Sequence, residues 1–320
     1  MKAAVYDQAG PASVFRYADL PDPQPGPDEV LIAVEAISLE GGDLIHRRTA
    51  PPPHPDYVVG YAASGTITAI GSNVTDRKVG DRVASVNLAG SHAALRVVKA
   101  SMTWLVPDGV DIAQASVVPV AFGTAYQCLF VRGGLKSGES LLVQGAAGGV
   151  GVAAVQLARQ AGATVIAVAS GTERTERLLE LGAHHVIDRQ KEDVVERVKE
   201  ITGGRGVDLV LDPVGTTLPA SLQALCEEGR LVFVGNAGGG SDLKLELWPA
   251  MQKNQSLHGV YLAPLLERPA TRQIMEDMFE ALAKGQLKVV IDRVFPLSDA
   301  AGAHEFSETA KPLGRVILKP

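Results

Sequence analysis

Two kinds of hydrophobic pattern divide this chain of 320 residues. Up to about residue 110, short apolar runs alternate with glycine and proline turns, which predicts strands. The clearest of these runs are 30–34, 63–70 and 81–86. Beyond residue 110, short apolar runs alternate with segments whose apolar residues recur at helical spacing, a pattern typical of a doubly wound parallel sheet. The sequence therefore predicts a β-rich region followed by an α/β region.

In the α/β region, the expected strands and helices alternate regularly. Its expected strands are 141–143, 165–168, 185–187, 209–211 and 231–234. Its expected helices are 150–160, 173–181, 192–202 and 218–228. The alternation ends near residue 257, after which we expect a helix at 274–284 and strands at 289–295 and 315–318. We expect this tail to return to the first region, so that residues 1–117 and 258–320 form one domain and residues 118–257 a second one inserted into it.

An uncharged run at 112–131 is long enough to raise the question of a membrane helix. Pro119, Gly123, Gln114 and Gln127 interrupt the run, which favours buried helical segments instead.

Composition narrows the possible partners and the compartment. The chain has 30 basic and 36 acidic residues and a net charge of −6, so we expect neither a nucleic-acid partner nor a membrane partner. Cys128 and Cys226 are the only cysteines and lack metal-ligand spacing, which indicates a reducing compartment and excludes zinc fingers. The first ten residues lack the apolar core of a secretory signal, and a cytoplasmic protein is expected.

The segment LLVQGAAGGVG, residues 141–151, joins a buried strand to a glycine-rich turn and a helix. Backbone N–H groups at such a helix start can bind a pyrophosphate, and we expect contacts at Ala147, Gly148, Gly149 and Val150. The spacing departs from the strict G-x-G-x-x-G pattern, and a purely structural turn is the alternative. A further strand at 163–169 completes a strand–turn–helix–strand unit of about 30 residues, which favours nucleotide binding.

With these residues in place, the chain resembles the medium-chain dehydrogenase/reductase superfamily and, within it, the zinc-free quinone oxidoreductases related to zeta-crystallin. The resemblance spans essentially the whole chain. It is carried by EVLIAVEAISLEGGD (29–43), VGDRV (79–83), PVAFGTAY (119–126), GESLLVQGAAGGVG (138–151), LGA (181–183), GVDLVLDPVG (206–215) and GRLVFVGN (229–236). It implies a Rossmann doubly wound sheet inserted in a GroES-like β-barrel catalytic domain, a nicotinamide cofactor, and a homodimer or homotetramer.

The resemblance also bears on metal use. The ligands of the catalytic zinc in zinc-dependent relatives align with Glu40, Tyr61 and Val120, and only Glu40 can ligate a metal. A catalytic zinc needs about three protein ligands. We therefore expect zinc-independent chemistry, which favours a conjugated acceptor such as a quinone or enone over an unactivated alcohol.

The residues after the second strand of the α/β region predict NADPH. NAD sites usually place an acidic residue there, whereas this strand ends in Ala169 and Ser170, followed by Gly171. Arg174 follows in the first turn of the next helix, at the position where the resemblance places a basic residue for the 2′-phosphate, and Arg189 matches a position that can flank the same phosphate. The alternative is that both arginines are solvated charges.

The nicotinamide end is expected where two later strands finish. The resemblance places Gly235 and Asn236 near the carboxamide, the backbone of Val214 against the cofactor, and Thr124 beside the ring. An ordinary turn is the alternative for Asn236 and a buried helix cap for Thr124. Asp212 has its own alternative, which is to cap the following turn.

Glu40, Tyr61 and Thr124 are the candidate catalytic residues. Glu40 stands where relatives typically have Asn, Ile45 replaces their Tyr, and Ala62 an acidic residue that is common there. Two interpretations of Glu40 are open, a proton donor with a pKa raised by burial or a solvated loop carboxylate.

These observations together predict an NADPH-dependent, zinc-independent reductase that transfers hydride to a quinone. The alternatives are a 2-alkenal, enone or enoyl thioester reductase and, in another class, a non-catalytic NADPH-binding protein. The sequence does not specify the acceptor.

Overall fold

The computed structural model describes residues 1–239 and 244–320. These residues form two compact units: unit 1 comprises residues 1–123 and 263–320, and unit 2 comprises residues 124–262. Both boundaries lie a few residues beyond the domain limits expected from the sequence.

Unit 1 is built on a largely antiparallel sheet. The order of its described strands is β14-β15-β3-β4-β5-β7, and β6 also pairs with β3. β15 runs antiparallel to β3, with Ile317 opposite Ser38, so the tail returns to the first region as expected. The strands of this sheet are β3 (Glu29–Ser38), β4 (Ala62–Ile70), β5 (Arg82–Val86), β6 (Leu95–Lys99), β7 (Thr103–Leu105), β14 (Ile291–Pro296) and β15 (Arg315–Lys319). A separate pair of antiparallel strands consists of β1 (Lys2–Val5) and β2 (Arg16–Asp19).

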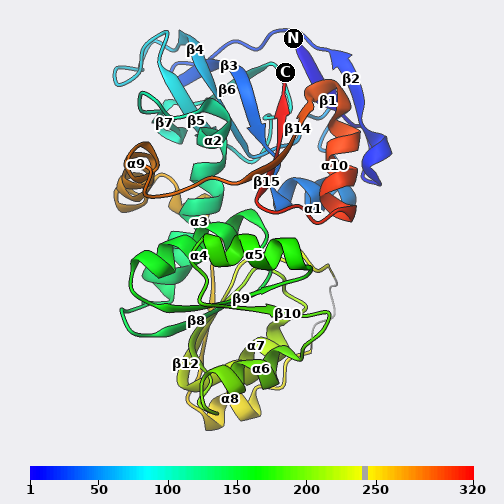
Figure 1. The fold of residues 1–320 in the computed structure, drawn as a ribbon. Coiled ribbons are helices and arrows are strands. Elements are labelled where there is room, and N and C mark those ends of the chain that lie inside the picture. Colours follow the sequence, from blue (N-terminus) through cyan, green and yellow to red (C-terminus); the bar gives the residue numbers. More distant parts are fainter. Residues whose placement is uncertain (240–243) are drawn as a thin grey trace. The chain divides into compact units, whose positions relative to one another are not determined.

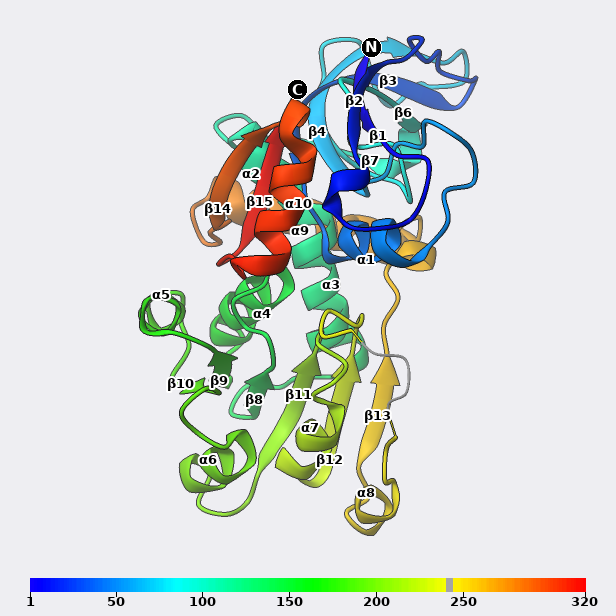
Figure 2. The same cartoon turned by 90° about the vertical axis from the view of Figure 1, so that its right-hand side faces the viewer.

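The helices of unit 1 cover this sheet. Figure 2 shows α10 alongside β14 and β15, and the buried side chains of Val316, Leu318 and Ala303 fill the core between them. The expected helix at 274–284 begins earlier, at Pro269, because proline fits the first turn of a helix. The main helices are α1 (Gly41–Thr49), α2 (Ile112–Val117), α9 (Pro269–Ala283) and α10 (Ala300–Thr309).

The apolar run expected to form buried helices is one continuous helical stretch. It comprises α2, the π-helical turn η3 (Val118–Phe122), α3 (Gly123–Tyr126) and the π-helical turn η4 (Gln127–Arg132). The Asp111 side chain caps its start by accepting from the N–H groups of Ala113 and Gln114, at 2.9 and 3.1 Å. By length and composition the stretch is apolar enough to cross a membrane, but 72% of its most apolar window is buried inside the protein.

Unit 2 contains a parallel sheet of described strands in the order β10-β9-β8-β11-β12-β13. Its strands are β8 (Ser140–Val143), β9 (Thr164–Ala169), β10 (His185–Asp188), β11 (Val207–Asp212), β12 (Leu225–Phe233) and β13 (Ser256–Gly259). Figure 1 shows α4 and α5 on one side of it and α6 and α7 on the other. The helices are α4 (Gly149–Gln160), α5 (Thr172–Glu180), α6 (Val194–Ile201), α7 (Leu218–Ala224) and α8 (Trp248–Gln252). The doubly wound prediction is confirmed.

The expected helix at 218–228 is four residues too long, because α7 ends at Ala224. Leu225 and Cys226 are buried in β12 instead, where Leu225 pairs with Val207 of β11. Pairing in the sheet therefore overrides a helical spacing that extended too far. β13, at 256–259, was not predicted.

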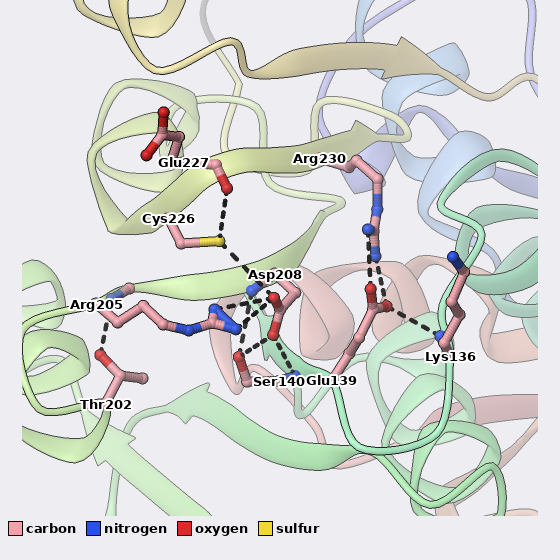
Figure 3. Close-up of polar contacts among 10 residues, drawn as sticks. Lys136, Glu139, Ser140, Thr202, Arg205, Asp208, Cys226, Glu227 and Arg230 are labelled. Carbon is pink, nitrogen blue, oxygen red and sulfur yellow. Dashed lines mark hydrogen bonds and ion pairs between the residues drawn. The ribbon is translucent and has the colours of Figure 1, made fainter.

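Side chains join the strands of unit 2 toward their amino ends (Figure 3). Arg230 donates to both oxygens of Glu139, Nη1 to Oε1 at 3.0 Å and Nη2 to Oε2 at 2.6 Å. Ser140 donates through its N–H and its hydroxyl to Asp208, at 2.8 and 2.7 Å, and Arg205 donates to the other oxygen of Asp208. Ion pairs and hydrogen bonds thus link the neighbouring strands at the amino-terminal edge of this sheet.

Candidate active site

The expected cofactor residues of unit 2 lie in turns at the carboxyl edge of its sheet. Because the strands are parallel, the turns after β8, β9, β11 and β12 share that edge. The Ala146 N–H donates to the Val168 carbonyl at 3.0 Å, and a Cβ added at Gly145 would lie 3.0 Å from Val214 Cγ2. The structure therefore brings the glycine-rich turn together with the ends of the neighbouring strands.

The start of α4 leaves space for an anion. Gly148 is exposed at the N-cap, and a Cβ there would meet only the Gly145 carbonyl oxygen, at 3.5 Å. The first three residues of α4 are Gly149, Val150 and Gly151, whose N–H groups have no carbonyl within the helix to bind. A Cβ at Gly151 would lie 2.5 Å from Ala146 Cα, so this glycine lets the helix start approach the strand closely. The turn fits a dinucleotide diphosphate.

Two predicted arginines converge on Ser170 at the end of β9. Arg174 Nη1 donates to the Ser170 carbonyl at 2.9 Å, and Arg189 Nε donates to the Ser170 hydroxyl at 3.0 Å. Gly171 adopts a φ of 89°, which favours glycine, and begins the turn into α5. Glu173, beside Arg174, is exposed. The geometry gathers the expected phosphate-binding side chains at one position.

Sequence reasoning missed Asp188, which ends β10 beside this arginine pair. The Gln190 N–H donates to its carboxylate at 3.1 Å, and Lys191 lies 3.4 Å away. Hydrogen bonds from the N–H groups of Gln190 and Gly171, together with Lys191, lower the pKa of Asp188. The carboxylate of Asp188 is thus bound by its own neighbours in the chain. Its position at the end of the third expected strand could have identified it from the sequence.

The turns after β11 and β12 meet at the expected nicotinamide end. A Cβ at Gly215 would lie 2.7 Å from Asn236 Oδ1, so the Asn236 side chain lies against the Gly215 backbone. Gly235 has a φ of 85°, and both Gly235 and Asn236 are exposed.

Asp212 caps the turn after β11, which is the alternative that the sequence left open for this residue. Its side chain is fully buried and accepts from the N–H groups of Val214 and Gly215, at 2.9 and 3.0 Å, and from the hydroxyls of Thr217 and Ser221. The Val214 carbonyl in turn accepts from the Gly238 N–H at 2.8 Å. The expected contact of the Val214 backbone with a cofactor stays a prediction.

Thr124 lies within the continuous helical stretch 112–132 and is 5% exposed. The Gly123 N–H already donates back to the Val118 carbonyl, so the helix does not begin at Thr124. The helix-cap interpretation of Thr124 is therefore wrong, and its place beside the nicotinamide stays a prediction.

In unit 1, Glu40 is buried directly before α1 with 2% of its surface exposed. The Ser38 hydroxyl donates to Glu40 Oε1 at 2.7 Å, and Arg315 Nη2 pairs with Oε2. Burial raises the pKa of Glu40, while the charge of Arg315 and the bond from Ser38 oppose that rise. The interpretation of Glu40 as a solvated loop carboxylate is wrong.

Asp43 and Tyr61 support the same corner of unit 1. Asp43 is fully buried and accepts from the N–H groups of Glu40, at 2.9 Å, and Tyr61, at 3.1 Å. Burial raises the pKa of Asp43 to about 8 despite these bonds. The Tyr61 ring lies against Gly42, where a Cβ would come within 2.2 Å of Cε2.

The expected zinc positions do not gather ligands. Glu40 is paired with Arg315, and Val120 lies in the apolar turn η3. Over residues 1–239 and 244–320, no three His, Cys, Asp or Glu side chains group as a metal site. Zinc independence itself stays a prediction.

Comparisons with known proteins identify the family. The alcohol dehydrogenase GroES-like domain matches residues 26–108, and the zinc-binding dehydrogenase family matches residues 149–292. A 2-haloacrylate reductase of Burkholderia sp is 32% identical over 100% of this chain and 99% of its own length. A quinone oxidoreductase of Sus scrofa is 30% identical over 98% of this chain and 96% of its own length.

Among solved structures, the Escherichia coli quinone oxidoreductase complexed with NADPH has a TM-score of 0.94 and 29% identity, with 100% of both chains covered. The chain belongs to the medium-chain dehydrogenase/reductase superfamily, in its quinone oxidoreductase-like family. It is an oxidoreductase with the GroES-like and Rossmann-type architecture of that family.

Proposed function

We propose that this chain is an NADPH-dependent, zinc-independent reductase of electron-poor acceptors. Unit 2 binds the cofactor, and unit 1 supplies the acceptor site, including Glu40. The observation that carries the cofactor assignment is the convergence of Arg174 and Arg189 on Ser170, next to the open start of α4. Bound NADPH supplies the hydride.

The cofactor-binding roles follow from the carboxyl edge of unit 2. The amides of Ala147, Gly149 and Val150 hold the diphosphate, and Gly148, whose own N–H donates to the Gly145 carbonyl at 3.0 Å, lets the diphosphate approach because it has no side chain. The 2′-phosphate binds the group formed by Ser170, Gly171, Arg174 and Arg189. The nicotinamide end is bound by Thr124, Val214, Gly235 and Asn236.

The first candidate acceptor is a quinone. Both the Sus scrofa relative and the Escherichia coli structure are quinone oxidoreductases. A quinone needs no strong protein acid, because the hydroquinone anion can take a proton from water.

The second candidate acceptor is a conjugated alkene, as in an enone, an enoyl thioester or an unsaturated acid. Its specific support is Glu40, a buried carboxyl group with a raised pKa, which suits protonation of an enolate. The 2-haloacrylate reductase relative is consistent with this chemistry.

Arg174→Ala tests the cofactor assignment. Loss of a charge-assisted bond to phosphate should raise the Kd for NADPH about 10- to 100-fold and leave the Kd for NADH nearly unchanged. Calorimetry measures both constants. Arg177→Ala on the same helix is the matched control, since Arg177 is exposed and pairs with Glu180. Equal weakening of both coenzymes by Arg174→Ala would refute the phosphate role.

An acceptor panel separates the candidate functions. NADPH oxidation is followed by absorbance with 1,4-benzoquinone, an α,β-unsaturated ketone and 2-chloroacrylate. Turnover with the quinone alone supports the first acceptor, and turnover with the alkenes supports the second. Tight NADPH binding without turnover on any of them supports a non-catalytic NADPH-binding protein.

We further propose that the protein is a cytoplasmic homodimer joined at the edge strand β13. β13 pairs with β12 on one side, and its neighbourhood exposes Leu257 (42%), Trp248 (66%) and Tyr261 (66%). Within the described residues β13 is the edge strand of its sheet, and the backbone groups that an edge strand leaves unpaired are a template for self-association. Light scattering should give a dimer mass, and Leu257→Asp should give a monomer; a wild-type monomer refutes the proposal.

A further inference from the structure

Arg315 begins β15 and reaches Glu40 at the end of β3. The side chain of Arg315 is 12% exposed and that of Glu40 is 2% exposed, so the ion pair is nearly out of contact with solvent. With Ser38 donating to the other oxygen, each carboxyl oxygen of Glu40 has its own donor. Arg315 Nε is buried without a hydrogen-bond partner among the described residues. Arg315 thus forms its ion pair with Glu40 although its own Nε–H has no hydrogen-bond acceptor among the described residues.

Asp43 and Arg96 are the other charged groups near Glu40, and the charge of Glu40 contributes to the raised pKa of Asp43. Asp43 accepts from backbone N–H groups, and the charge of Arg315 reaches it only as a secondary influence. Arg96 donates to the Tyr61 carbonyl at 2.7 Å, and its charge faces Asp43. Arg315 is thus the cation in direct contact with Glu40.

We propose that Arg315 is a positioning residue for Glu40: its guanidinium fixes the carboxyl group and sets the pH range in which Glu40 exchanges its proton. The inference rests on the proposed function, in which Glu40 protonates the reduced alkene. Arg315 does not touch the reacting atoms in this scheme.

Bound NADPH would supply the hydride for a new C–H bond at the β-carbon of the acceptor and become NADP⁺, and the electron pair of the alkene would move to give an enolate. The O–H bond of Glu40 then breaks as a C–H bond forms at the α-carbon. Glu40 is left as a carboxylate paired with Arg315 and is reprotonated from water.

Arg315 matters because burial alone would make Glu40 a poor acid. Burial raises the pKa of Glu40, and the guanidinium opposes that rise. A general acid works best when its pKa lies near the operating pH. The cation also stabilises the carboxylate left after proton transfer, which favours donation of the proton.

Direct titration of Glu40 in the full chain tests the inference without requiring turnover. The chain is labelled with ¹³C-glutamate, and the Glu40 carboxyl signal is assigned by its absence in Glu40→Gln. Arg315→Met should move the Glu40 midpoint upward by about 1 to 3 pH units. Arg315→Lys, which keeps the charge, should restore most of the wild-type midpoint. Arg230→Met, which breaks the Glu139–Arg230 pair of unit 2, should leave it unchanged.

An unchanged Glu40 midpoint in Arg315→Met overturns the inference; if that variant does not fold, an unchanged midpoint in Arg315→Gln does so. A turnover measurement then separates this failure from that of the proposed function. With an enone, the alkaline fall in kcat should move upward with the Glu40 midpoint, whereas the profile with benzoquinone should stay in place. A moved midpoint with a fixed enone profile supports the control of Glu40 by Arg315 and refutes the proton-donor role.

Discussion

The two units each contain a glutamate–arginine pair, and the two glutamates titrate in opposite directions. In unit 2, Glu139 and Arg230 form a two-pronged pair near the amino ends of the strands (Figure 3). In unit 1, Glu40 and Arg315 pair beside the start of α1. The pKa of Glu139 is lowered and that of Glu40 is raised.

Burial and the number of donors explain this difference. Desolvation is the largest influence on both carboxyl groups. Glu139 keeps 19% of its side chain exposed, and the two bonds from Arg230 and one from the Lys136 N–H together outweigh desolvation. Glu40 keeps 2%, and Arg315 with Ser38 does not offset the loss of water. The same residue types thus give a structural ion pair in one unit and a candidate acid in the other.

The two glutamates should differ most in their effect on turnover. Glu40→Gln removes the proton but keeps the shape, so kcat with an enone should fall about 100- to 10,000-fold. Reduction of benzoquinone should change little, because water can protonate its product. Steady-state kinetics with both acceptors measure the loss of kcat with the enone relative to the loss with benzoquinone.

Glu139→Gln is the matched control for that experiment, since it should leave both acceptors at wild-type rates. An equal loss with enone and quinone in Glu40→Gln would mean that Glu40 is structural, like Glu139. The functional difference between the two pairs would then disappear.

The sequence predicted the sheet of unit 2 because its signals are local. The buried run at 141–143 and the glycines that follow determine their own conformation, and β8 and α4 lie where expected. The sequence also singled out Ser170, Arg174 and Arg189, which the structure brings together, because each follows a strand whose end is visible in the sequence.

The environment of Glu40 could not be found in this way. Its partner Arg315 lies at the other end of the chain, and only the pairing of β15 with β3 brings the two together. His92 and His304 form a similar distant pair, with Nε2 atoms 3.0 Å apart in the core. A pattern along one chain does not reveal such pairs, and burial of Glu40 depends on them.

The Glu139–Arg230 pair should also contribute more to stability than an exposed ion pair does. Glu139→Gln leaves the partly buried Arg230 without its charged partner, which should lower the free energy of unfolding by about 1.5 to 3 kcal/mol. Urea denaturation followed by circular dichroism measures the loss. Glu180→Gln is the control, because the Glu180–Arg177 pair is exposed and should change stability by less than about 0.5 kcal/mol. Equal losses would show that the pair in Figure 3 contributes no more than a surface pair.

The smallest effect is a difference in sign between two pH dependences. Glu139 has a folded-state pKa below its ordinary 4.5, so its contribution is present above pH 4.5 and is lost as the pH falls through the folded value. The stability gap between wild type and Glu139→Gln should therefore close on acidification. Glu40 has a raised folded-state pKa, so the native state holds its proton more tightly than the unfolded chain. Its contribution is present below 4.5 and is lost as the pH rises.

Relative to wild type, Glu40→Gln should thus gain stability as the pH increases from about 4.5, by at most about 1.4 kcal/mol per pH unit. Burial also raises the pKa of Asp43, to about 8, so the stability of both wild type and variant declines as the pH rises. Because this decline has the same sign in both proteins, it does not reverse the difference between them. Urea midpoints measured from pH 4 to pH 8 on wild type and both variants give the two slopes. Slopes of the same sign would mean that Glu40 is ionised in the native state as readily as Glu139. Arg315 would then fully offset burial, and the carboxyl group would have no proton to give at neutral pH.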